Sequence, residues 1–402
     1  MERIVVVGAG QAGAACVARL RAEGFAGQIT LIGEEHVPPY QRPPLSKAYL
    51  LGEMALERLY LRPESYYAET GIELVLDTRV TAIDRADRQV IAGGVSYPYD
   101  ALVLATGSVP RRLPASIGGD LQGVHVVRTL TDVDAMGPGM QPGRRALIVG
   151  GGYIGLEAAA VASKRGMEVT LIEMAERILQ RVACPETSEY FRDLHRAHGV
   201  DIREGLGLTR LEGVEGRVTS AVFSDGTEQP VDMVIVGIGI TPATKLAEAA
   251  GLEVENGIKV DAQGRSSDPA IWAAGDCASF PYKCGRIRLE SVQNAIDQSE
   301  AVAKNILGAG AEYQPQPWFW SDQYDVKLQI AGLNTGYDRV VVRDGGAARS
   351  HWYYAGDTLL AVDAMNDPRG YMIGKRLIEA GRSPAPEIVG DPEADLKPLL
   401  KG

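Results

Sequence analysis

Close to its N-terminus the chain contains Arg3-Ile4-Val5-Val6-Val7 followed by Gly8-Ala9-Gly10-Gln11-Ala12-Gly13, an apolar run that leads into a glycine-rich turn. The alanine-rich stretch from Ala14 to Leu20 follows and predicts a helix. A second apolar run, Gln28 to Ile32, predicts a further strand. This order of strand, glycine turn, helix and strand is typical of a βαβ unit that binds a dinucleotide.

Each glycine of this turn has its own expected role. Gly8 permits the tight turn, Gly10 lets the backbone approach a pyrophosphate, and Gly13 allows close packing of the helix. The helix N-terminus supplies amide donors and the positive end of a dipole. Glu34 and Glu35 follow the second strand, where a carboxylate can accept hydrogen bonds from ribose hydroxyls.

The same pattern returns in the middle of the chain. Arg145 to Val149 is an apolar run, and it leads into Gly150-Gly151-Gly152-Tyr153-Ile154-Gly155 and a predicted helix through Leu156 to Lys164. The strand Glu168 to Ile172 ends at Glu173. A carboxylate there hydrogen-bonds a free 2′-hydroxyl and repels a 2′-phosphate, so we expect NADH in preference to NADPH. Arg177 and Arg181 argue weakly against this preference.

Two nucleotide sites on one polypeptide suggest that electrons pass between two nucleotides. The alternative for either motif is a glycine turn in another doubly wound fold. The strand–turn–helix context of both copies argues against that alternative. With 402 residues, the chain is too long for one ordinary core and suits two or three domains.

Two further apolar runs end in motifs that suggest a flavin. Leu102 to Ala105 predicts a buried strand ending at Thr106-Gly107, and Ile271 to Ala274 predicts another, ending at Gly275-Asp276 before a helix. With these motifs the chain resembles the flavoproteins that have two dinucleotide-binding domains. The resemblance implies that Asp276 binds the ribityl or pyrophosphate part of FAD. It also implies that the first glycine turn binds FAD and the second binds NADH.

Longer strings make the resemblance more specific. They are Pro43 to Leu50 (PPLSKAYL), Val127 to Leu130 (VRTL), Gly150 to Glu157, Leu289 to Ala295 (LESVQNA) and Pro317 to Tyr324 (PWFWSDQY). Over nearly its whole length the chain is similar to the ferredoxin reductases that serve oxygenases. The resemblance implies that the flavin is surrounded by Lys47, Arg128, Asp276, Val292 and Trp320, and that Glu157 and Glu290 lie near the nicotinamide.

The expected fold is α/β, with two Rossmann-like, glutathione-reductase-like dinucleotide-binding domains and a smaller α+β C-terminal domain. Domain changes are expected in polar or proline-rich stretches. They divide the chain into an FAD-binding domain at 1–111 and 241–317, an NADH-binding domain at 112–240 and a C-terminal interface domain at 318–402. We expect Glu73 to Asp77 and Gln89 to Ile91 to form strands of an inserted sheet. Alternating strands and a helix around Tyr371 to Ala380 are expected in the C-terminal domain.

The predicted catalytic residues are Lys47, Glu157, Glu290 and Trp320. An ammonium at Lys47 beside the flavin favours its reduced anionic form, and Glu157 could pair with Lys47 or hold the carboxamide. From the residues alone, Lys47 could be a surface lysine and Glu157 an acid favoured by the helix dipole. The aromatic rings near Trp320 can exclude water from the flavin. The alternative for that domain is a simple packing or dimerisation module.

The cysteines and histidines predict no other chemistry. We find no CxxC or CxxxxC pair for dithiol catalysis among Cys16, Cys184, Cys277 and Cys284. Cys277 is expected to pack as a small buried apolar group. His195 and His198 lie at the end of a predicted amphipathic helix, where we expect them to be solvated. No ligand spacing predicts a metal site.

The expected activity is NADH-dependent reduction of a [2Fe-2S] ferredoxin that supplies a haem monooxygenase or a ring-hydroxylating dioxygenase. NADH gives up two electrons as one hydride, FAD can release them singly, and an iron–sulfur cluster accepts one at a time. An alternative from another class is an NADH-responsive redox interaction protein of the apoptosis-inducing-factor type. A rival enzyme, NADH oxidase or peroxidase, would need a redox-active cysteine near the flavin.

Charge and hydropathy limit the cellular setting. The net charge of −11 means that an acidic ferredoxin needs a local basic patch. Candidates for this patch are Lys283, Arg286, Arg288, Lys327 and Lys375. No basic run predicts nucleic-acid binding, and no apolar run reaches the length of about 18 residues that spans a bilayer. The chain enters a strand almost at once, which leaves no room for a signal peptide. We expect a cytoplasmic monomer or weak dimer.

Overall fold

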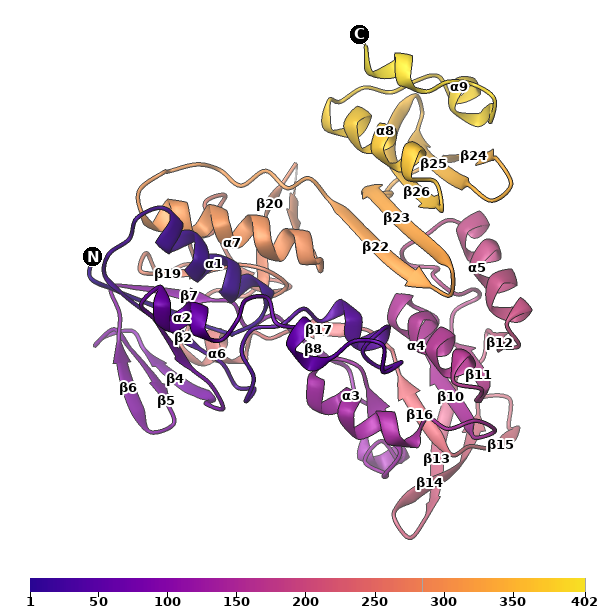
Figure 1. Ribbon diagram of the computed structural model, residues 1–402, viewed down its shortest axis with the longest axis horizontal. Helices are drawn as coiled ribbons and strands as arrows, with labels where there is room; N and C mark the ends of the chain where they lie inside the picture. Colours follow the sequence, from indigo (N-terminus) through magenta and orange to yellow (C-terminus); the bar gives the residue numbers. More distant parts are fainter. Residues whose placement is uncertain (284, 402) are drawn as a thin grey trace. The chain divides into compact units, whose positions relative to one another are not determined.

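The computed structural model describes residues 1–283 and 285–401, and Figure 1 shows the course of the chain. Contacts divide the chain into two compact units. Unit 1 contains Met1–Gln41, Ala55–Val109 and Ile240–Pro317, and unit 2 contains Arg42–Met54, Pro110–Gly239 and Trp318–Gly402. The segment Arg42–Met54 therefore groups with unit 2, although the sequence division placed it in the first domain. The division into three domains stays a prediction.

Unit 1 is built on a five-stranded parallel sheet. Its strands in spatial order are β19 (Ile271–Ala273), β7 (Ala101–Leu104), β1 (Arg3–Val7), β2 (Gln28–Ile32) and β3 (Ile72–Val75). The chain leaves β1 for β2 on one side and β7 lies on the other, so the order reverses at the carboxyl end of β1. In open α/β sheets, ligands bind at such a reversal.

The helices of unit 1 include α1 (Gln11–Ala22) and α7 (Val292–Ile306), which pack together (Figure 1). Between α1, α7 and the sheet lies a core that includes Cys16, Val17 and Val302. The shorter helices are α2 (Ser65–Glu69) and α6 (Lys245–Ala249). Apolar residues cover the other face of the sheet too, which explains why its strands are almost uninterrupted apolar runs.

Two expectations for unit 1 were wrong. The strand near Glu73 is β3, which pairs in parallel with β2 in the main sheet. The inserted antiparallel sheet instead contains β4 (Val80–Asp84), β5 (Gln89–Ala92) and β6 (Val95–Pro98). After Asp276 a strand follows, not a helix, because the apolar residues of β20 (Ala278–Tyr282) are buried between β18 (Ile258–Lys259) and β21 (Gly285–Ile287). Two short strands, β8 (Ser108–Pro110) and β17 (Ile240–Pro242), also pair.

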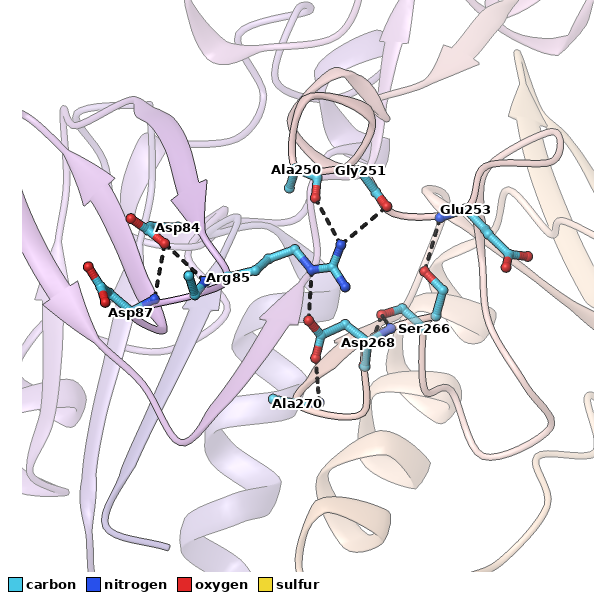
Figure 2. A network of polar contacts seen from close by, with 11 residues as sticks. Asp84, Arg85, Asp87, Ala250, Gly251, Glu253, Ser266, Asp268 and Ala270 are labelled. Carbon is cyan, nitrogen blue, oxygen red and sulfur yellow. Dashed lines mark hydrogen bonds and ion pairs between the residues drawn. The ribbon is translucent and has the colours of Figure 1, made fainter.

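Arg85 joins sequence-distant parts of unit 1, as Figure 2 shows. From the end of β4 its guanidinium donates to Asp268 Oδ2 at 2.7 Å and to the carbonyls of Ala250 and Gly251 at 3.2 and 3.3 Å. Burial raises the pKa of Asp268, but the hydrogen bonds from Arg85 and the Ala270 amide outweigh it and leave that pKa below its usual value. Arg85 thus connects two sequence-distant segments of unit 1 by an ion pair and hydrogen bonds.

Unit 2 contains a second five-stranded parallel sheet with the same reversal of order at its central strand. Its strands in spatial order are β12 (Asp201–Glu204), β11 (Glu168–Glu173), β10 (Arg145–Val149), β16 (Met233–Val236) and β9 (Val124–Val126). The accompanying helices are α3 (Leu130–Met136), α4 (Tyr153–Lys164) and α5 (Pro185–Ala197). A three-stranded antiparallel sheet contains β13 (Leu208–Val214), β14 (Arg217–Phe223) and β15 (Glu228–Pro230).

The C-terminal part of unit 2 is a five-stranded antiparallel sheet with two α-helices, where the sequence predicted alternating strands and one helix. Its strands in spatial order are β22 (Trp318–Gln323), β23 (Val326–Gly332), β26 (Thr358–Met365), β25 (Arg349–Ala355) and β24 (Arg339–Asp344). Helices α8 (Pro368–Glu379) and α9 (Pro386–Gly390) complete it. Trp352, Val362 and Leu377 form part of its core. Within the described part of the chain, no helix has the length and apolar character needed to cross a membrane.

Candidate active site

The three glycines of the first turn have different surroundings. Gly8 has φ +110°, and a Cβ there would meet Ala105 O at 2.2 Å. A Cβ on Gly13 would meet Gly8 O at 2.0 Å, so only glycine lets α1 pack against the turn. A Cβ on Gly10, in contrast, would meet no other atom within 4 Å apart from its chain neighbours. The fold itself therefore requires Gly8 and Gly13, whereas Gly10 leaves open the space that a close-approaching phosphate would need.

The second turn repeats this geometry. Gly150 has φ +106° and its Cβ would meet Gly237 O at 2.5 Å, while a Cβ on Gly155 would meet Gly150 O at 2.0 Å. Gly152 again has nothing within 4 Å. The two turns lie at the ends of the two central strands, β1 and β10, and before the helices α1 and α4. Both turns therefore suit a dinucleotide pyrophosphate in the same way.

The acidic residues after the second strands already have partners. Glu34 forms an exposed ion pair with Arg79 at 2.5 Å, and Glu35 accepts a hydrogen bond from Tyr40 at 2.6 Å. Glu173 accepts hydrogen bonds from the amides of Gly151 at 2.7 Å and Ala175 at 2.8 Å. Glu173 is thus fixed beside the glycine turn of unit 2, where its carboxylate can face a ribose.

The two arginines near Glu173 differ in their contacts. Arg177 is turned into its own loop, where it donates to Ser188 Oγ at 2.5 Å and to the carbonyl of Ala183 at 2.9 Å. Arg181 lies near Gly239, since its Nη2 is 3.7 Å from the position of a Cβ there. Arg177 therefore has a structural role, so it no longer argues against NADH, the nucleotide with a free 2′-hydroxyl.

The motifs that suggested a flavin lie close together in unit 1. Thr106 donates to the carbonyl of Ala243 at 2.8 Å, and Gly107 adopts φ +69°. Asp276 follows the neighbouring strand β19 and accepts from Ser108 Oγ at 2.8 Å. Hydrogen bonding thus links the two motifs at one edge of the sheet.

The remaining site residues of unit 1 lie around the start of α7. Val292 is its first residue, and Ser291 caps it by accepting from the amide of Asn294. Glu290 directly precedes the cap, is exposed, and pairs with Arg288 at 2.5 Å. Glu290 thus pairs with a cation and keeps 38% of its side chain exposed.

Lys47 and Glu157 form an ion pair within unit 2. Pairing with Lys47 is one of the two roles considered for Glu157. Lys47 Nζ lies 2.6 Å from Glu157 Oε2, and the side chain of Glu157 is only 3% exposed while that of Lys47 is 18% exposed. Glu157 lies in the first half of α4, and Lys47 follows the short 3₁₀ helix Pro43–Ser46. A buried carboxylate needs such compensation, since desolvation of an unpaired charge is costly.

Sequence reasoning missed two further partners of Glu157. Ser46 Oγ donates to Oε2 at 2.5 Å, and Ser321 Oγ donates to Oε1 at 2.7 Å. Both serines are buried. Ser46 directly precedes Lys47, and Ser321 directly follows Trp320. Because side chains alternate along a strand, the sequence could have shown that Ser321 lies on the opposite face of β22 from Trp320. The Glu157 carboxylate therefore accepts hydrogen bonds from three donors, Lys47, Ser46 and Ser321.

The aromatic string and Arg128 also belong to unit 2. Trp320 lies in β22, with its ring centroid 5.5 Å from that of Trp318. Arg128 precedes the Thr129 cap of α3, and its carbonyl accepts from Arg42 at 2.7 Å, which ties the Lys47 segment to this region. The residues expected around the flavin are thus divided between the two units.

Tyr153 and Ile154 begin α4, directly after the second glycine turn. The Tyr153 ring packs against Phe319 with centroids 5.0 Å apart, and its hydroxyl has no hydrogen-bond partner among residues 1–283 and 285–401. Burial, followed by the nearby Asp363 and Cys184, raises the pKa of Tyr153 well above its usual value. Ile154 is 43% exposed. The Tyr153 hydroxyl thus points into the protein, whereas Ile154 is the more exposed residue of this pair.

The structure describes three of the cysteines, Cys16, Cys184 and Cys277, and all are buried and free. Burial raises the pKa of the Cys277 thiol, which lies 3.4 Å from the carbonyl oxygens of Leu104 and Ala274. A thiol of this kind is a poor nucleophile, because exchange requires the thiolate. Cys284, the other residue considered for a dithiol pair, lies outside the described residues.

The expectation that His195 and His198 are both solvated was half wrong. His198 is exposed, but His195 is completely buried. The reason is tertiary, because the C-terminal residues Gln323 and Tyr324 cover this end of α5 and hydrogen-bond both ring nitrogens of His195. Burial lowers the pKa of His195 to about 4, so the ring is neutral near pH 7.

Two parallel sheets with matching glycine turns, followed by an antiparallel domain, define a nucleotide-dependent oxidoreductase. The family model for pyridine nucleotide-disulphide oxidoreductases matches residues 2–299, and the Reductase C-terminal model matches residues 318–400. A ferredoxin–NAD(P)(+) reductase of a Sphingomonas species is 45% identical over 99% of this chain and 97% of its own length. The chain therefore belongs to the pyridine nucleotide-disulphide oxidoreductase family, among its ferredoxin reductases.

Two further comparisons agree with this assignment. Putidaredoxin reductase of Pseudomonas putida is 42% identical, over 99% of this chain and 97% of its own length. The crystal structure of a covalent putidaredoxin reductase–putidaredoxin complex superimposes with a TM-score of 0.96 at 42% identity, covering 100% of this chain and 98% of that one. The fold class expected from the sequence is confirmed.

Proposed function

We propose that this protein is an FAD-dependent NADH:ferredoxin oxidoreductase. The observation that carries the proposal is the repeated glycine geometry, in which Gly10 and Gly152 each leave open the space that a pyrophosphate needs. Flavin, when bound, accepts a hydride and releases electrons one at a time. The names of the similar proteins support this reading over the redox interaction protein of the apoptosis-inducing-factor type.

Gly8, Gly10 and Gly13 would hold FAD with Asp276, and Gly150 to Gly155 would hold the nicotinamide nucleotide. Glu173 supports NADH over NADPH, because its fixed carboxylate would repel a 2′-phosphate. Lys47 and Glu157 would position the reacting rings, and the Lys47 ammonium would stabilise negative charge on the reduced flavin. Trp320 would shield that ring from water.

The electron acceptor would be a [2Fe-2S] ferredoxin. The complex of putidaredoxin reductase with putidaredoxin supports a small redox protein as partner, because that reductase has the same fold at 42% identity. We further propose that the ferredoxin serves a haem monooxygenase or a ring-hydroxylating dioxygenase, that the protein is cytoplasmic, and that it is a monomer or weak dimer.

Rapid mixing of the purified, FAD-loaded protein with each nucleotide tests the proposal. The loss of the oxidised-flavin absorbance near 450 nm should be much faster with NADH than with NADPH, because Glu173 repels the extra phosphate. Equal or faster reduction by NADPH would reject the NADH assignment. A protein that retains no FAD, or that binds NADH without flavin reduction, would reject the reductase reading.

A further inference from the structure

A buried hydrogen-bond chain leads from the end of α5 to Glu157. Tyr324 OH lies 3.2 Å from His195 Nδ1, and His195 Nε2 lies 2.8 Å from Gln323 Oε1. Gln323 Nε2 lies 3.2 Å from Ser321 Oγ, which is 2.7 Å from Glu157 Oε1. His195 and Ser321 are 0% exposed, Gln323 1% and Glu157 2%. Solvent therefore cannot substitute for a missing link.

Every bond of this chain has one possible direction. An amide oxygen only accepts, so His195 Nε2 carries the proton and Nδ1 accepts from Tyr324. The Gln323 amide nitrogen then donates to Ser321 Oγ. The Ser321 proton is left to point at Glu157, whose other oxygen is taken by Ser46 and Lys47. The neutral state of His195 is the one that this order requires.

The β22 residues of this hydrogen-bond chain lie on one face of the strand. Side chains alternate along β22, so Phe319, Ser321 and Gln323 share the face opposite Trp318 and Trp320. Both Phe319 and Ser321 contact α4, through Tyr153 and Glu157 respectively. Strand β22 is thus fixed to the helix that follows the second glycine turn.

We propose that Ser321, Gln323 and His195 are positioning residues that hold the Glu157 carboxylate in one rotamer and thereby keep the Lys47 ammonium in place for hydride transfer. The hydride-transfer part of this inference rests on the proposed function. The positioning part concerns only the protein and can be tested without turnover. A proton relay is not implied, because the amide of Gln323 does not readily pass a proton along such a chain.

Labelling of Lys47 tests the positioning directly. Acetic anhydride acylates a lysine amine that it can reach, and the Lys47 amine is only 18% exposed and is held against Glu157, so it should react slowly. Mass spectrometry gives the rate at Lys47. Glu157→Gln sets the fast limit. Ser321→Ala and Gln323→Leu should label Lys47 several-fold faster than the wild-type protein, whereas Ser321→Thr, which keeps the hydroxyl, should label slowly.

Thr187→Val is the matched control. Thr187 is also a buried hydroxyl that joins α5 to the C-terminal sheet, by donating to Asp363 at 2.8 Å. Within residues 1–283 and 285–401, none of its hydrogen bonds leads to Glu157. If the faster labelling of Lys47 came only from weaker packing between α5 and the C-terminal sheet, Thr187→Val should show it too. We expect its Lys47 labelling to equal that of the wild-type protein. If Ser321→Ala does not fold, Ser321→Cys replaces it, because a thiol keeps the volume and is a weak donor.

Flavin reduction by NADH then tests the link to function. Ser321→Ala and Gln323→Leu should each slow it by about tenfold, which corresponds to one hydrogen bond to a charged group. In a Glu157→Gln background the same changes should have no further effect, because the group that they position is gone.

The inference is overturned if Ser321→Ala and Gln323→Leu label Lys47 and reduce flavin like the wild-type protein. It is also overturned if Thr187→Val reproduces their effects, or if the effects add to those of Glu157→Gln. A wild-type protein that no nicotinamide nucleotide reduces would instead reject the proposed function, and the labelling experiment would still decide the positioning.

Discussion

Buried titratable side chains connect α5 to the C-terminal sheet of unit 2. Thr187 lies 2.7 Å from His351 Nδ1 and donates to Asp363, which also accepts from Tyr353. Burial, then the charge of Arg349, lowers the pKa of His351 to about 4. Burial raises the pKa of Asp363 to about 6, against the hydrogen bonds from Tyr353 and Thr187. His351 and Asp363 therefore change the stability of the fold in opposite directions as the pH falls.

The sign of each effect follows from which state binds more protons. A histidine with a lowered pKa stabilises the fold above its ordinary value of 6.5, and this stability is lost as the pH falls toward 4. Asp363, with a raised pKa, contributes stability below 3.8 that is lost as the pH rises through 6. Because His195 and His351 together outweigh Asp363, we expect these groups to make the fold less stable from pH 6.5 to 4.5.

The variant His351→Gln should reduce this acid destabilisation by about 2 kcal/mol, which is the linkage expected for one such imidazole over that interval. Urea unfolding at pH 6.5 and pH 4.5 measures it, and the comparison within each variant removes any general loss of stability. The exposed His198→Gln is the control and should keep the wild-type difference. An unchanged difference in His351→Gln would contradict the assignment.

Catalysis should need no thiol, because Cys277 is buried with a raised pKa. Replacing Cys277 and Cys284 by Ser should leave NADH-dependent ferricyanide reduction within several-fold of the wild-type rate. Flavin content serves as the control for folding. Loss of turnover at normal flavin content would require a dithiol mechanism.

At the scale of residues, motifs in the sequence identified the glycines and Lys47 as candidates, and their roles stay predictions, whereas the burial of His195 was not foreseen. Burial of His195 depends on Gln323 and Tyr324, which are far away in the chain. The same holds for Ser321, whose contact with Glu157 requires knowledge of which face of β22 meets α4. Local patterns carry no information on such partners.

At the scale of elements, apolar runs bounded by glycine were sufficient to predict β1, β2 and β10 with the bounds that the structure shows. The strand near Glu73 was found, but it was assigned to the wrong sheet. Its parallel pairing with β2 is a non-local property that its residues do not encode by themselves. The helix expected after Asp276 failed because short apolar runs are typical of both strands and helices.

The two kinds of glycine in each turn should respond differently to alanine. Gly155→Ala places a Cβ 2.0 Å from Gly150 O and should destabilise unit 2. Gly152→Ala has free space and an ordinary φ of −80°, so the fold should persist while the KM for NADH rises by about tenfold or more. Urea unfolding and steady-state kinetics separate the two effects.

The first turn provides the matched pair. Gly10→Ala should lose FAD more readily while remaining folded, and Gly13→Ala should be destabilised by its contact with Gly8 O. If Gly152→Ala left the KM for NADH unchanged and Gly10→Ala retained FAD as tightly as the wild-type protein, these turns would not be the pyrophosphate sites.

At the scale of the whole molecule, the net charge of −11 makes the position of basic residues important for an acidic partner. Two candidates are already engaged, since Arg286 donates to the carbonyls of Val260 and Ser279, and Arg288 pairs with Glu290. Lys327 is exposed, as is Lys283 of unit 1, whereas Lys375 is half-buried, pairs with Glu379 at 3.5 Å and lies 5.7 Å from the Trp318 ring. Among these candidates Lys283 and Lys327 are thus the exposed charges, and Lys327 is the one that lies in the C-terminal sheet.

The double variant Lys327→Glu, Lys375→Glu should raise the KM for a [2Fe-2S] ferredoxin, because it removes attraction to an acidic partner. It should also flatten the dependence of ferredoxin reduction on salt, because salt weakens that attraction by screening charges more than about 8–10 Å apart at physiological ionic strength. Ferricyanide reduction needs no docking and should not change. The double reversal Lys245→Glu, Arg58→Glu at exposed positions of unit 1 changes the net charge by the same amount and provides the control. Equal effects of both reversals would reject docking on the C-terminal domain.

In the proposed function, electrons pass from NADH to a one-electron protein carrier. An anaerobic titration tests it most directly, with a catalytic amount of the protein, limiting NADH, and an excess of a [2Fe-2S] ferredoxin from the same organism followed by its visible absorbance. Each NADH should reduce two ferredoxin molecules, because one hydride carries two electrons and each cluster accepts one. Oxidation of NADH without ferredoxin reduction, or a change in association state on NADH binding with no electron transfer, would contradict the account.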